Sequence, residues 1–534
     1  MAAIVHSGDV RAAVAKVPIR DVRSPLGRGR TFAPAARAVQ GQGWGEPRGR
    51  GGRGSGSVDA RADGGRNSRD HAGDSKDRAT RRHSGSRVDG AAGVVRIDRA
   101  SAEDLMSLSG DNASVPMHVG AVLLLSQAGA VDVPEVMANL RERLPRVPRL
   151  RRRLVRAPLG GGRPVWVDDA TFRLSDHIAV VRHRGQDLER AALDHAARLM
   201  TTRLDRNRPL WTARLIVADG GDAGGAALVL VFHHVLADGM AGLAVLAALT
   251  DDSVAVHDAA FPRPAPSSRQ LRADAFAEHL HRLRVLPRSL HRSARALGVL
   301  LPALRVRAAS LSLNRPTGAR RRIETVGCAL AAVRAAGAAS GATINDVILT
   351  VVAGAISEVL SARGELVEEL VISVPFSSRR AAESGQLGNH SGVVPFVVPT
   401  TGSFGDRLAS VHEATARAKH GDRGSSALIL GPAFRILAGT RLYRSFIDHQ
   451  RMVHTIVTNV RGPDHLVRLA GLSVTQIIPL SVATGNITVA FAAASYAGRL
   501  TITLIADPEA VPDLDALRPA LVEQLSALAI EVVR

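Results

Sequence analysis

Two adjacent histidines at the end of an apolar run are the residues of this sequence best suited to chemistry. The run Val229–Phe232 is typical of a buried strand, and His233, His234 and then an Asp238–Gly239 pair follow it. An imidazole titrates near neutral pH, so a histidine at the mouth of an apolar sheet is suited to act as a general base. Because successive strand side chains point to opposite faces, His233 and His234 cannot do the same job.

The Asp238–Gly239 pair predicts a sharp turn, at which the glycine would let a substrate approach the backbone closely. The same residues also fit a purely structural interpretation. A histidine pair at a strand end can be purely structural, with its hydrogen bonds satisfied within the fold, and Asp-Gly is an ordinary turn dipeptide. The surrounding sequence therefore has to decide between a catalytic and a structural site.

The composition is that of a globular protein with ample material for a core. The chain has 534 residues, of which 46% are hydrophobic, 22% charged and 3% aromatic, and a chain of this length can hold about two to four domains. Its single cysteine, Cys328, cannot form an internal disulfide, which suits a reducing cytoplasm. We find neither an uninterrupted apolar stretch of about 18 or more residues nor the apolar core of a signal peptide, so we expect a soluble or peripherally bound intracellular protein.

Much of the net charge of +20 lies in an amino-terminal tail. Residues 1–90 hold 16 Arg and 2 Lys against 9 acidic residues, with many glycines and few large apolar side chains. Such a segment buries too little surface to offset its ordering entropy, so we expect residues 1–93 to be disordered. The tail could bind RNA or anionic lipid. It could equally be a solvated extension, or a stretch translated from a misassigned start codon.

A nucleic-acid partner would depend on this tail alone. The tail contains Phe32 and Trp44 but no recognisable pattern of stacking residues. We therefore do not expect nucleic acid among the partners of the protein.

Apolar periodicity predicts alternating strands and helices from Val94 onward, which indicates an α/β protein with two mixed layers in tandem. We expect a first subdomain over 94–260, a linker over 261–322 and a second subdomain over 323–534. The expected strands are 118–125, 211–218, 226–234, 323–330, 369–375, 453–459, 485–496 and 500–506, and the expected helices are 101–110, 132–144, 186–203, 239–249, 343–362, 405–418 and 513–534.

The linker 261–322 is dense in proline and arginine, and Leu280–Leu286 within it is basic and amphipathic. This pattern is compatible with an interdomain crossover, with a helix on a membrane surface, or with both. A solvated connector fits it equally well.

Five further motifs accompany the histidines. They are Pro209-Leu210-Trp211; Asn345-Asp346-Val347-Ile348-Leu349; Val374-Pro375-Phe376-Ser377-Ser378-Arg379, followed by Gly388-Asn389; Ser495-Tyr496-Ala497-Gly498; and Ala506-Asp507. In this order they resemble the bacterial wax ester synthase/diacylglycerol acyltransferase family. That family belongs to the CoA-dependent acyltransferases with a His-His-x-x-x-Asp-Gly motif. The resemblance spans about residues 95–534.

The resemblance implies two similar subdomains with a channel between them that reaches the catalytic histidine from both sides. Acyl-CoA would enter one mouth and the acceptor alcohol the other. It implies that His234 is the general base, that His233 supports the strand end, that Asp238 holds the loop through a salt bridge and that Gly239 makes the turn. It implies no metal and no cofactor, acyl-CoA being a co-substrate.

The motif match also gives Pro209, Trp211, Asn345 and Asp346 as candidate substrate-binding residues. Each has a structural alternative: Thr343-x-x-Asp346 has the form of a capping box, Asn345 could cap the same helix, and Trp211 could be core packing.

Three segments depart from the family pattern. They are Asp104-Leu105-Met106, Arg461 within Asn459–Pro463, and Ser377-Ser378. None touches the proposed base, so they put the acceptor preference in question more than the reaction type.

The expected activity is O-acyl transfer from a long-chain acyl-CoA to diacylglycerol or to a long-chain alcohol. Because the sequence has no Gly-x-Ser-x-Gly elbow and Cys328 lacks a supporting motif, direct attack is favoured over a covalent acyl-enzyme. The alternatives are a related acyltransferase acting on a polyketide, peptide or sugar hydroxyl, and a non-catalytic relative that binds lipid surfaces. We expect a cytoplasmic protein on the inner face of the membrane or on lipid inclusions.

Overall fold

The computed structural model describes residues 97–111, 115–219, 223–236, 239–253, 261–281, 283–284, 308–377, 391–420, 442–528, 530 and 532–533. The predicted tail, residues 1–93, lies outside the described residues. So do Asp238 and the greater part of the linker after residue 284.

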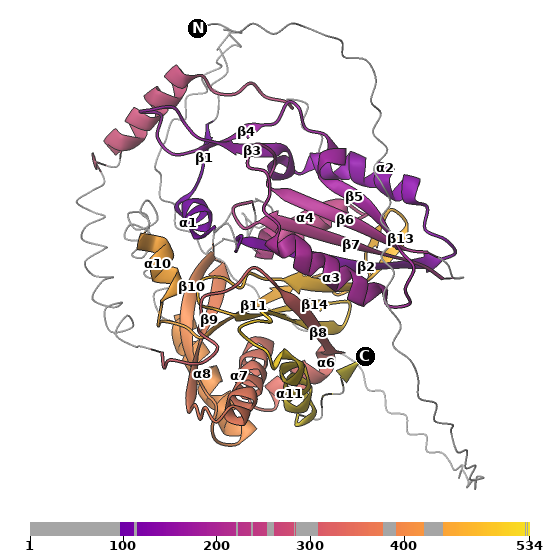
Figure 1. Ribbon diagram of the computed structural model, residues 1–534, viewed down its shortest axis with the longest axis vertical. Coiled ribbons are helices and arrows are strands. Elements are labelled where there is room, and N and C mark those ends of the chain that lie inside the picture. Colours follow the sequence, from indigo (N-terminus) through magenta and orange to yellow (C-terminus); the bar gives the residue numbers. More distant parts are fainter. Residues whose placement is uncertain are drawn as a thin grey trace, which may run out of the picture. The chain divides into compact units, whose positions relative to one another are not determined.

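The first sheet has six strands, and β2 and β7 form its centre (Figure 1). These two strands pair antiparallel over eleven residues, with His118 opposite His233 at one end. The strands in spatial order are β12 (Arg468–Leu469), β13 (Leu472–Leu480), β2 (His118–Ala128), β7 (Ala223–His233), β6 (Trp211–Ala218) and β5 (Ile178–His183).

Helices cover both faces of the first sheet. On one face, α2 (Val133–Arg143) and α4 (Gly239–Leu249) bury Leu140 and Val245 against the strands. On the other, α3 (Leu188–Thr201) buries Leu193. Helix α3 also contacts the second sheet, since Glu189 accepts a hydrogen bond from Thr325 at 2.8 Å.

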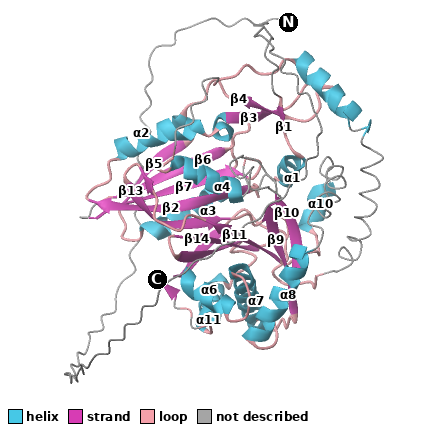
Figure 2. Ribbon diagram, turned by 180° about the vertical axis from the view of Figure 1, so that it is seen from behind, coloured by secondary structure: helices cyan, strands magenta, loops and turns pink. Residues whose placement is uncertain are grey.

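The second sheet has seven strands, and four helices cover its outer face (Figures 1 and 2). The strands in spatial order are β10 (Ser391–Pro399), β9 (Glu369–Ser377), β11 (Thr455–Arg461), β14 (Val489–Tyr496), β15 (Arg499–Ala506), β8 (Arg322–Ala329) and β16 (Val532–Val533); the helices are α6 (Leu330–Ala338), α7 (Ile344–Ala362), α8 (Phe404–His420) and α11 (Leu514–Ser526).

By length and composition, helix α7 is apolar enough to cross a membrane. In the fold it is the central helix of the second core, and Val351, Val352 and Ala355 are fully buried. Its apolar character is therefore explained by its burial in this core.

The inner faces of the two sheets share one apolar cluster. Val122 and Val229 of the first sheet pack with Ala490 and Ile505 of the second. This contact joins the two halves along the strands that the candidate site also uses.

A small third sheet, β1 (Asp98–Arg99), β4 (Val165–Asp168) and β3 (Arg152–Val155), lies beside a helix that covers residues 268–281 and continues at 283–284. The remaining described elements are α1 (Ala102–Gly110), α10 (Leu442–Asp448) and 3-10 turns at Leu144–Arg146, Pro148–Arg151 and Leu174–Asp176.

The predicted mixed α/β fold is confirmed, and the main corrections concern the second half. Strands β12 and β13 complete the first sheet, although the predicted boundary placed residues 468–480 in the second subdomain. The predicted helix from Asp513 to the end stops at Ser526, because Val532 and Val533 pair with β8 instead. The predicted strand from Gly485 begins only at Val489, since Gly485 turns with a positive φ of 63°.

We expect the substitution Gly120→Ala to lower the free energy of unfolding by about 1–3 kcal/mol. A β-carbon at Gly120 would overlap the Leu230 carbonyl oxygen of the neighbouring strand, and neither backbone can yield cheaply. Urea unfolding measures the loss. Gly405→Ala is the control, because its β-carbon would meet nothing closer than 3.9 Å. Equal midpoints for the two variants would contradict the close approach of β2 and β7.

Candidate active site

The two histidines lie on opposite sides of the end of β7. His233 is the last residue of the strand and is buried, whereas His234 begins the turn and lines a cavity of about 220 Å³. The backbone nitrogen of His234 donates a hydrogen bond to the Met117 carbonyl oxygen at 2.7 Å. The two imidazoles therefore lie in different surroundings, and their separate roles stay a prediction.

His233 is held from two directions. Its Nδ1 accepts a hydrogen bond from the backbone nitrogen of Val235 at 3.1 Å, so the ring proton of the neutral imidazole lies on Nε2. That Nε2 faces Oδ2 of Asp111 at 3.6 Å. The ring also lies edge-on to His118, with centroids 5.9 Å apart. These contacts fix the ring as a support for the turn that carries His234.

Asp111 is an ionised carboxylate in a buried place. Burial alone would raise the pKa of Asp111, but the neighbouring His233 and Arg206 lower it to about 2. Its Oδ2 accepts a hydrogen bond from Arg206 at 2.5 Å, and its Oδ1 accepts one from the Met117 backbone nitrogen at 3.2 Å. Met117 thus links this carboxylate to the backbone of His234.

Sequence reasoning missed Asp111 and His118. Both come more than a hundred residues before the histidine pair, and neither belongs to a recognisable motif. Only the pairing of β2 with β7 brings them to His233, and no local signal in the sequence predicts that register.

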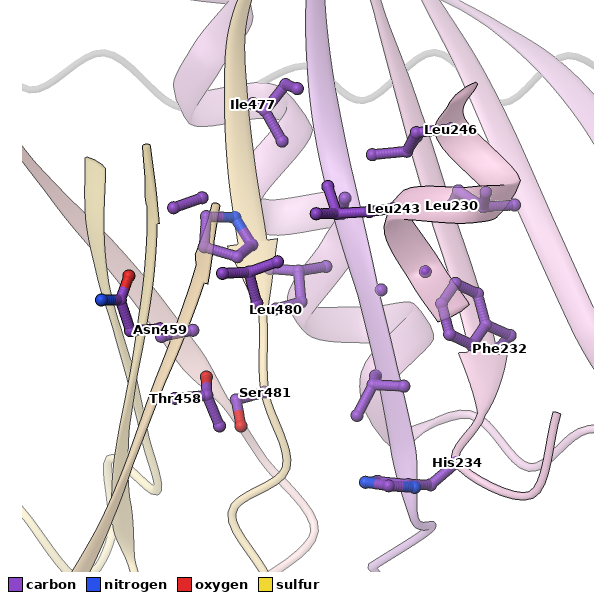
Figure 3. Close-up of a pocket in the computed structure, with 18 of the residues that line it drawn as sticks. Leu230, Phe232, His234, Leu243, Leu246, Thr458, Asn459, Ile477, Leu480 and Ser481 are labelled. Carbon is purple, nitrogen blue, oxygen red and sulfur yellow. The ribbon is translucent and has the colours of Figure 1, made fainter. Parts of the chain in front are cut away.

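Both halves of the fold form the wall of the cavity (Figure 3). The first sheet and its helix contribute Phe232 of β7, Leu243 and Leu246 of α4 and Leu480 of β13; the second sheet contributes Val460 of β11 and Ala492 of β14, among others. Most of the wall is apolar, so it suits a hydrocarbon chain more than a polar ligand.

A second cavity of about 320 Å³ adjoins the first. The two share Leu243, Leu246 and Ile477, so the apolar space extends along α4. The second cavity is also lined by Arg461 and Pro463. Arg461 is the residue that departs from the family pattern, and it therefore lies in the wall of a cavity rather than on a remote surface.

Three polar side chains of the second half also line the first cavity: Thr458 and Asn459 of β11 and Ser481 just after β13. In Figure 3 they lie across the cavity from the strand that carries His234. The sequence analysis noted Asn459 only as part of a departing segment. It missed Thr458 and Ser481, because a single hydroxyl residue in an apolar strand carries no signal of its own.

The remaining predicted residues on the first half lie elsewhere. Trp211 is buried, its Nε1 donates to the Leu150 carbonyl oxygen at 2.6 Å and its ring stacks on His177. Neither Trp211 nor Pro209 is among the described residues that line the cavity. Gly239 is the first residue of α4, and Asp238 lies outside the described residues.

Asp346 is a structural residue of helix α7. It completes a capping box with Thr343. Its carboxylate also accepts a hydrogen bond from the Thr415 hydroxyl at 2.7 Å and lies 3.0 Å from Nδ1 of His412. Burial would raise the pKa of Asp346, but these hydrogen bonds lower it. Neither Asp346 nor Asn345 is among the described residues that line the cavity. For Asp346 the geometry corresponds to the structural alternative, whereas the role of Asn345 stays a prediction.

Cys328 lies in β8 within the core of the second half, away from the residues that line the cavity. Burial raises the pKa of its thiol to about 11. A thiolate is the nucleophilic form of cysteine, so this residue is unsuited to carry an acyl group.

Comparisons with known proteins place this site in a family. The model of the wax ester synthase/diacylglycerol acyltransferase catalytic domain matches residues 101–348, and that of the WS/DGAT C-terminal domain matches residues 387–529. The chain belongs to the wax ester synthase/diacylglycerol acyltransferase family. The protein named "Probable diacyglycerol O-acyltransferase tgs1" of Mycobacterium tuberculosis H37Rv is 29% identical over 432 residues, which cover 78% of this chain and 91% of the relative.

Solved structures show the same fold. The wax ester synthase/diacylglycerol acyltransferase from Marinobacter aquaeolei VT8 matches with a TM-score of 0.58 and 23% identity, over 80% of this chain and 98% of that one. The first condensation domain of the calcium-dependent antibiotic synthetase matches with a TM-score of 0.55 and 18% identity, over 82% and 97%. The fold of this family member is therefore shared with proteins outside its family.

We expect stability to fall as the pH drops from about 6.5 to 4, because burial and the nearby His233 lower the pKa of His118 to about 4. Between these pH values the unfolded chain binds a proton on His118 that the folded chain does not bind. The free energy of unfolding is therefore at its full value above pH 6.5 and falls on acidification, by about 1.4 kcal/mol per unit of difference between the two pKa values. Urea midpoints at pH 7 and pH 5 measure it. His118→Gln should remove this part of the pH dependence and the exposed control His449→Gln should keep it; the same slope in both variants would contradict the assignment.

Proposed function

We propose that this chain transfers a long-chain fatty acyl group from acyl-CoA to the hydroxyl of diacylglycerol or of a long-chain alcohol. As a member of its family, the chain is an acyltransferase. The observation that carries the substrate class is the position of His234 in the wall of an apolar cavity formed by both halves. A hydrocarbon chain fits such a wall, and the imidazole supplies its proton-transfer group.

We propose direct attack with His234 as general base. The imidazole takes the proton of the acceptor hydroxyl while that oxygen bonds to the thioester carbonyl carbon. The tetrahedral intermediate then collapses with cleavage of the carbon–sulfur bond. The CoA thiolate leaves with the proton that His234 had taken, so the base is restored and no cofactor is consumed.

The tetrahedral oxyanion needs hydrogen-bond donors placed in advance. Thr458, Asn459 and Ser481 are the polar side chains of the second half that line the same cavity. We propose that donors for the oxyanion or for the acceptor hydroxyl come from this set. The Thr458 hydroxyl already contacts the Phe491 carbonyl oxygen at 3.4 Å, which favours Ser481 and Asn459.

The proposed acceptors reside in lipid, and this places the reaction at a lipid surface. We propose that the protein works in the cytoplasm, attached peripherally to the inner face of the membrane or to lipid inclusions. Its net charge of +20 favours anionic surfaces. Acyl-CoA is soluble and would arrive from the aqueous side.

We expect His234→Ala to lower acceptor-dependent CoA release by about 10²–10⁴-fold, which is the usual contribution of a general base. The assay gives purified protein palmitoyl-CoA with diacylglycerol or hexadecanol and follows the free thiol. The exposed His449→Ala is the matched control and should keep full activity. Release that the His234 substitution leaves unchanged would remove this residue as base. No release with any acceptor from the parent protein would overturn the proposed activity.

We expect Gly242→Leu to shift the preference toward shorter acyl chains. A β-carbon at Gly242 would already lie 3.2 Å from the Phe232 ring, so a leucine has to fill the cavity that both residues line. The ratio of kcat/KM for palmitoyl-CoA over butyryl-CoA should fall by about 10–200-fold. Ala244→Leu is the control on the same helix, since Ala244 does not line either cavity. Equal ratios in both variants would place the acyl chain elsewhere.

A further inference from the structure

One helix of the described chain presents an uncovered apolar stripe. The helix covers residues 268–281 and continues at 283–284, and Figure 1 shows it as the unlabelled pink helix beyond β1 and β4. Its inner side is anchored on the small third sheet. Leu271 packs with Val165 and Val167, and Arg99 pairs with Asp274 at 2.7 Å.

The outer side of the helix carries large apolar residues at helical spacing. Phe276 is 67% exposed, Leu280 38% and Leu283 56%. The steps of four and three residues put all three on one face of an α-helix. We name these three residues the docking stripe. Apolar side chains of this size gain free energy when they are removed from water, so a partner surface would stabilise them.

The charges around the docking stripe have one sign. Arg269, Arg272 and Arg284 are exposed on the described helix. The two acidic residues between 261 and 284, Asp274 and Glu278, instead pair with Arg99 and Arg163 of the small sheet. The outward face therefore combines an apolar stripe with positive charge alone.

We propose that the docking stripe is the surface on which the protein binds an anionic lipid surface. The helix would lie in the plane of the interface, with Phe276, Leu280 and Leu283 among the acyl chains and the arginines at the lipid phosphates. A protein partner or a second copy would not require this run of positive charge. The proposal rests on the proposed function only in that both acceptors are lipids; the binding itself needs no catalysis.

Vesicle flotation of the full chain tests the proposal. Vesicles of equal parts phosphatidylcholine and phosphatidylglycerol are compared with phosphatidylcholine alone. The triple variant Phe276→Ser, Leu280→Ser, Leu283→Ser should bind the anionic vesicles at least about tenfold more weakly than the parent. The matched control is Leu366→Ser with Leu466→Ser, which removes two exposed leucines elsewhere and should bind like the parent.

A second variant keeps the apolar side chains and removes charge. Arg272→Gln with Arg284→Gln should weaken binding to anionic vesicles several-fold and reduce its dependence on salt, while circular dichroism stays unchanged. Unchanged binding in both the triple and the charge variant would overturn the proposal, as would an equal loss in the leucine control. A change from dimer to monomer in sedimentation, with vesicle binding retained, would assign the stripe to self-association and also overturn it.

A soluble assay separates this proposal from the proposed function. With butyryl-CoA and a short alcohol in the absence of vesicles, the docking variants should keep the CoA release of the parent. If the parent shows no acyl transfer while the triple variant loses vesicle binding, the docking surface stands and the proposed activity falls. If acyl transfer is intact and the triple variant binds vesicles as the parent does, the proposed activity stands and the docking surface falls.

Discussion

The pairing of β2 with β7 is the constraint on which the rest of the site depends. It sets His118 opposite His233 and ends the ladder there, so that the next residue, His234, turns into the cavity. The hydrogen bond from His234 to the Met117 carbonyl closes this end, and Asp111 holds Met117 from the other side. The backbone position of His234 is thus set by the strand pairing and by two hydrogen bonds of the Met117 backbone, one with His234 and one with the buried Asp111 carboxylate.

The cavity exists because the second half of the chain contributes to the first. Strand β13 pairs with β2 and brings Ile477, Leu480 and the following Ser481 to the wall, while β11 of the second sheet brings Thr458 and Asn459. The apolar cluster between the sheets closes the space behind them. An apolar cavity with few polar groups near one imidazole would suit the proposed exchange between a thioester and an alcohol, since it keeps water away from both.

The sequence was sufficient for the elements with clear periodicity and caps. Strand β6, helix α3 and the capping boxes at Ser101 and Thr343 follow from local pattern, and His234 follows from its motif. Contacts that depend on register between distant segments could not be predicted. Asp111, Thr458 and Ser481 reach the site only through tertiary pairing, and Trp211 and Asp346 belong to conspicuous motifs for reasons of packing and capping. A motif marks a position that matters without saying whether it contacts a ligand.

The exchange of β13 into the first sheet has a consequence for how the chain is made. Until residues 472–480 have left the ribosome, β2 has no neighbour on one side, and a row of unpaired backbone groups on an apolar strand is open to the wrong partner. The first subdomain cannot finish folding ahead of the second, so the usual order of domain-by-domain folding during synthesis does not apply to this protein. Cutting the chain between its two sheets would leave an open edge, and His234, the proposed base, directly follows the strand next to that edge.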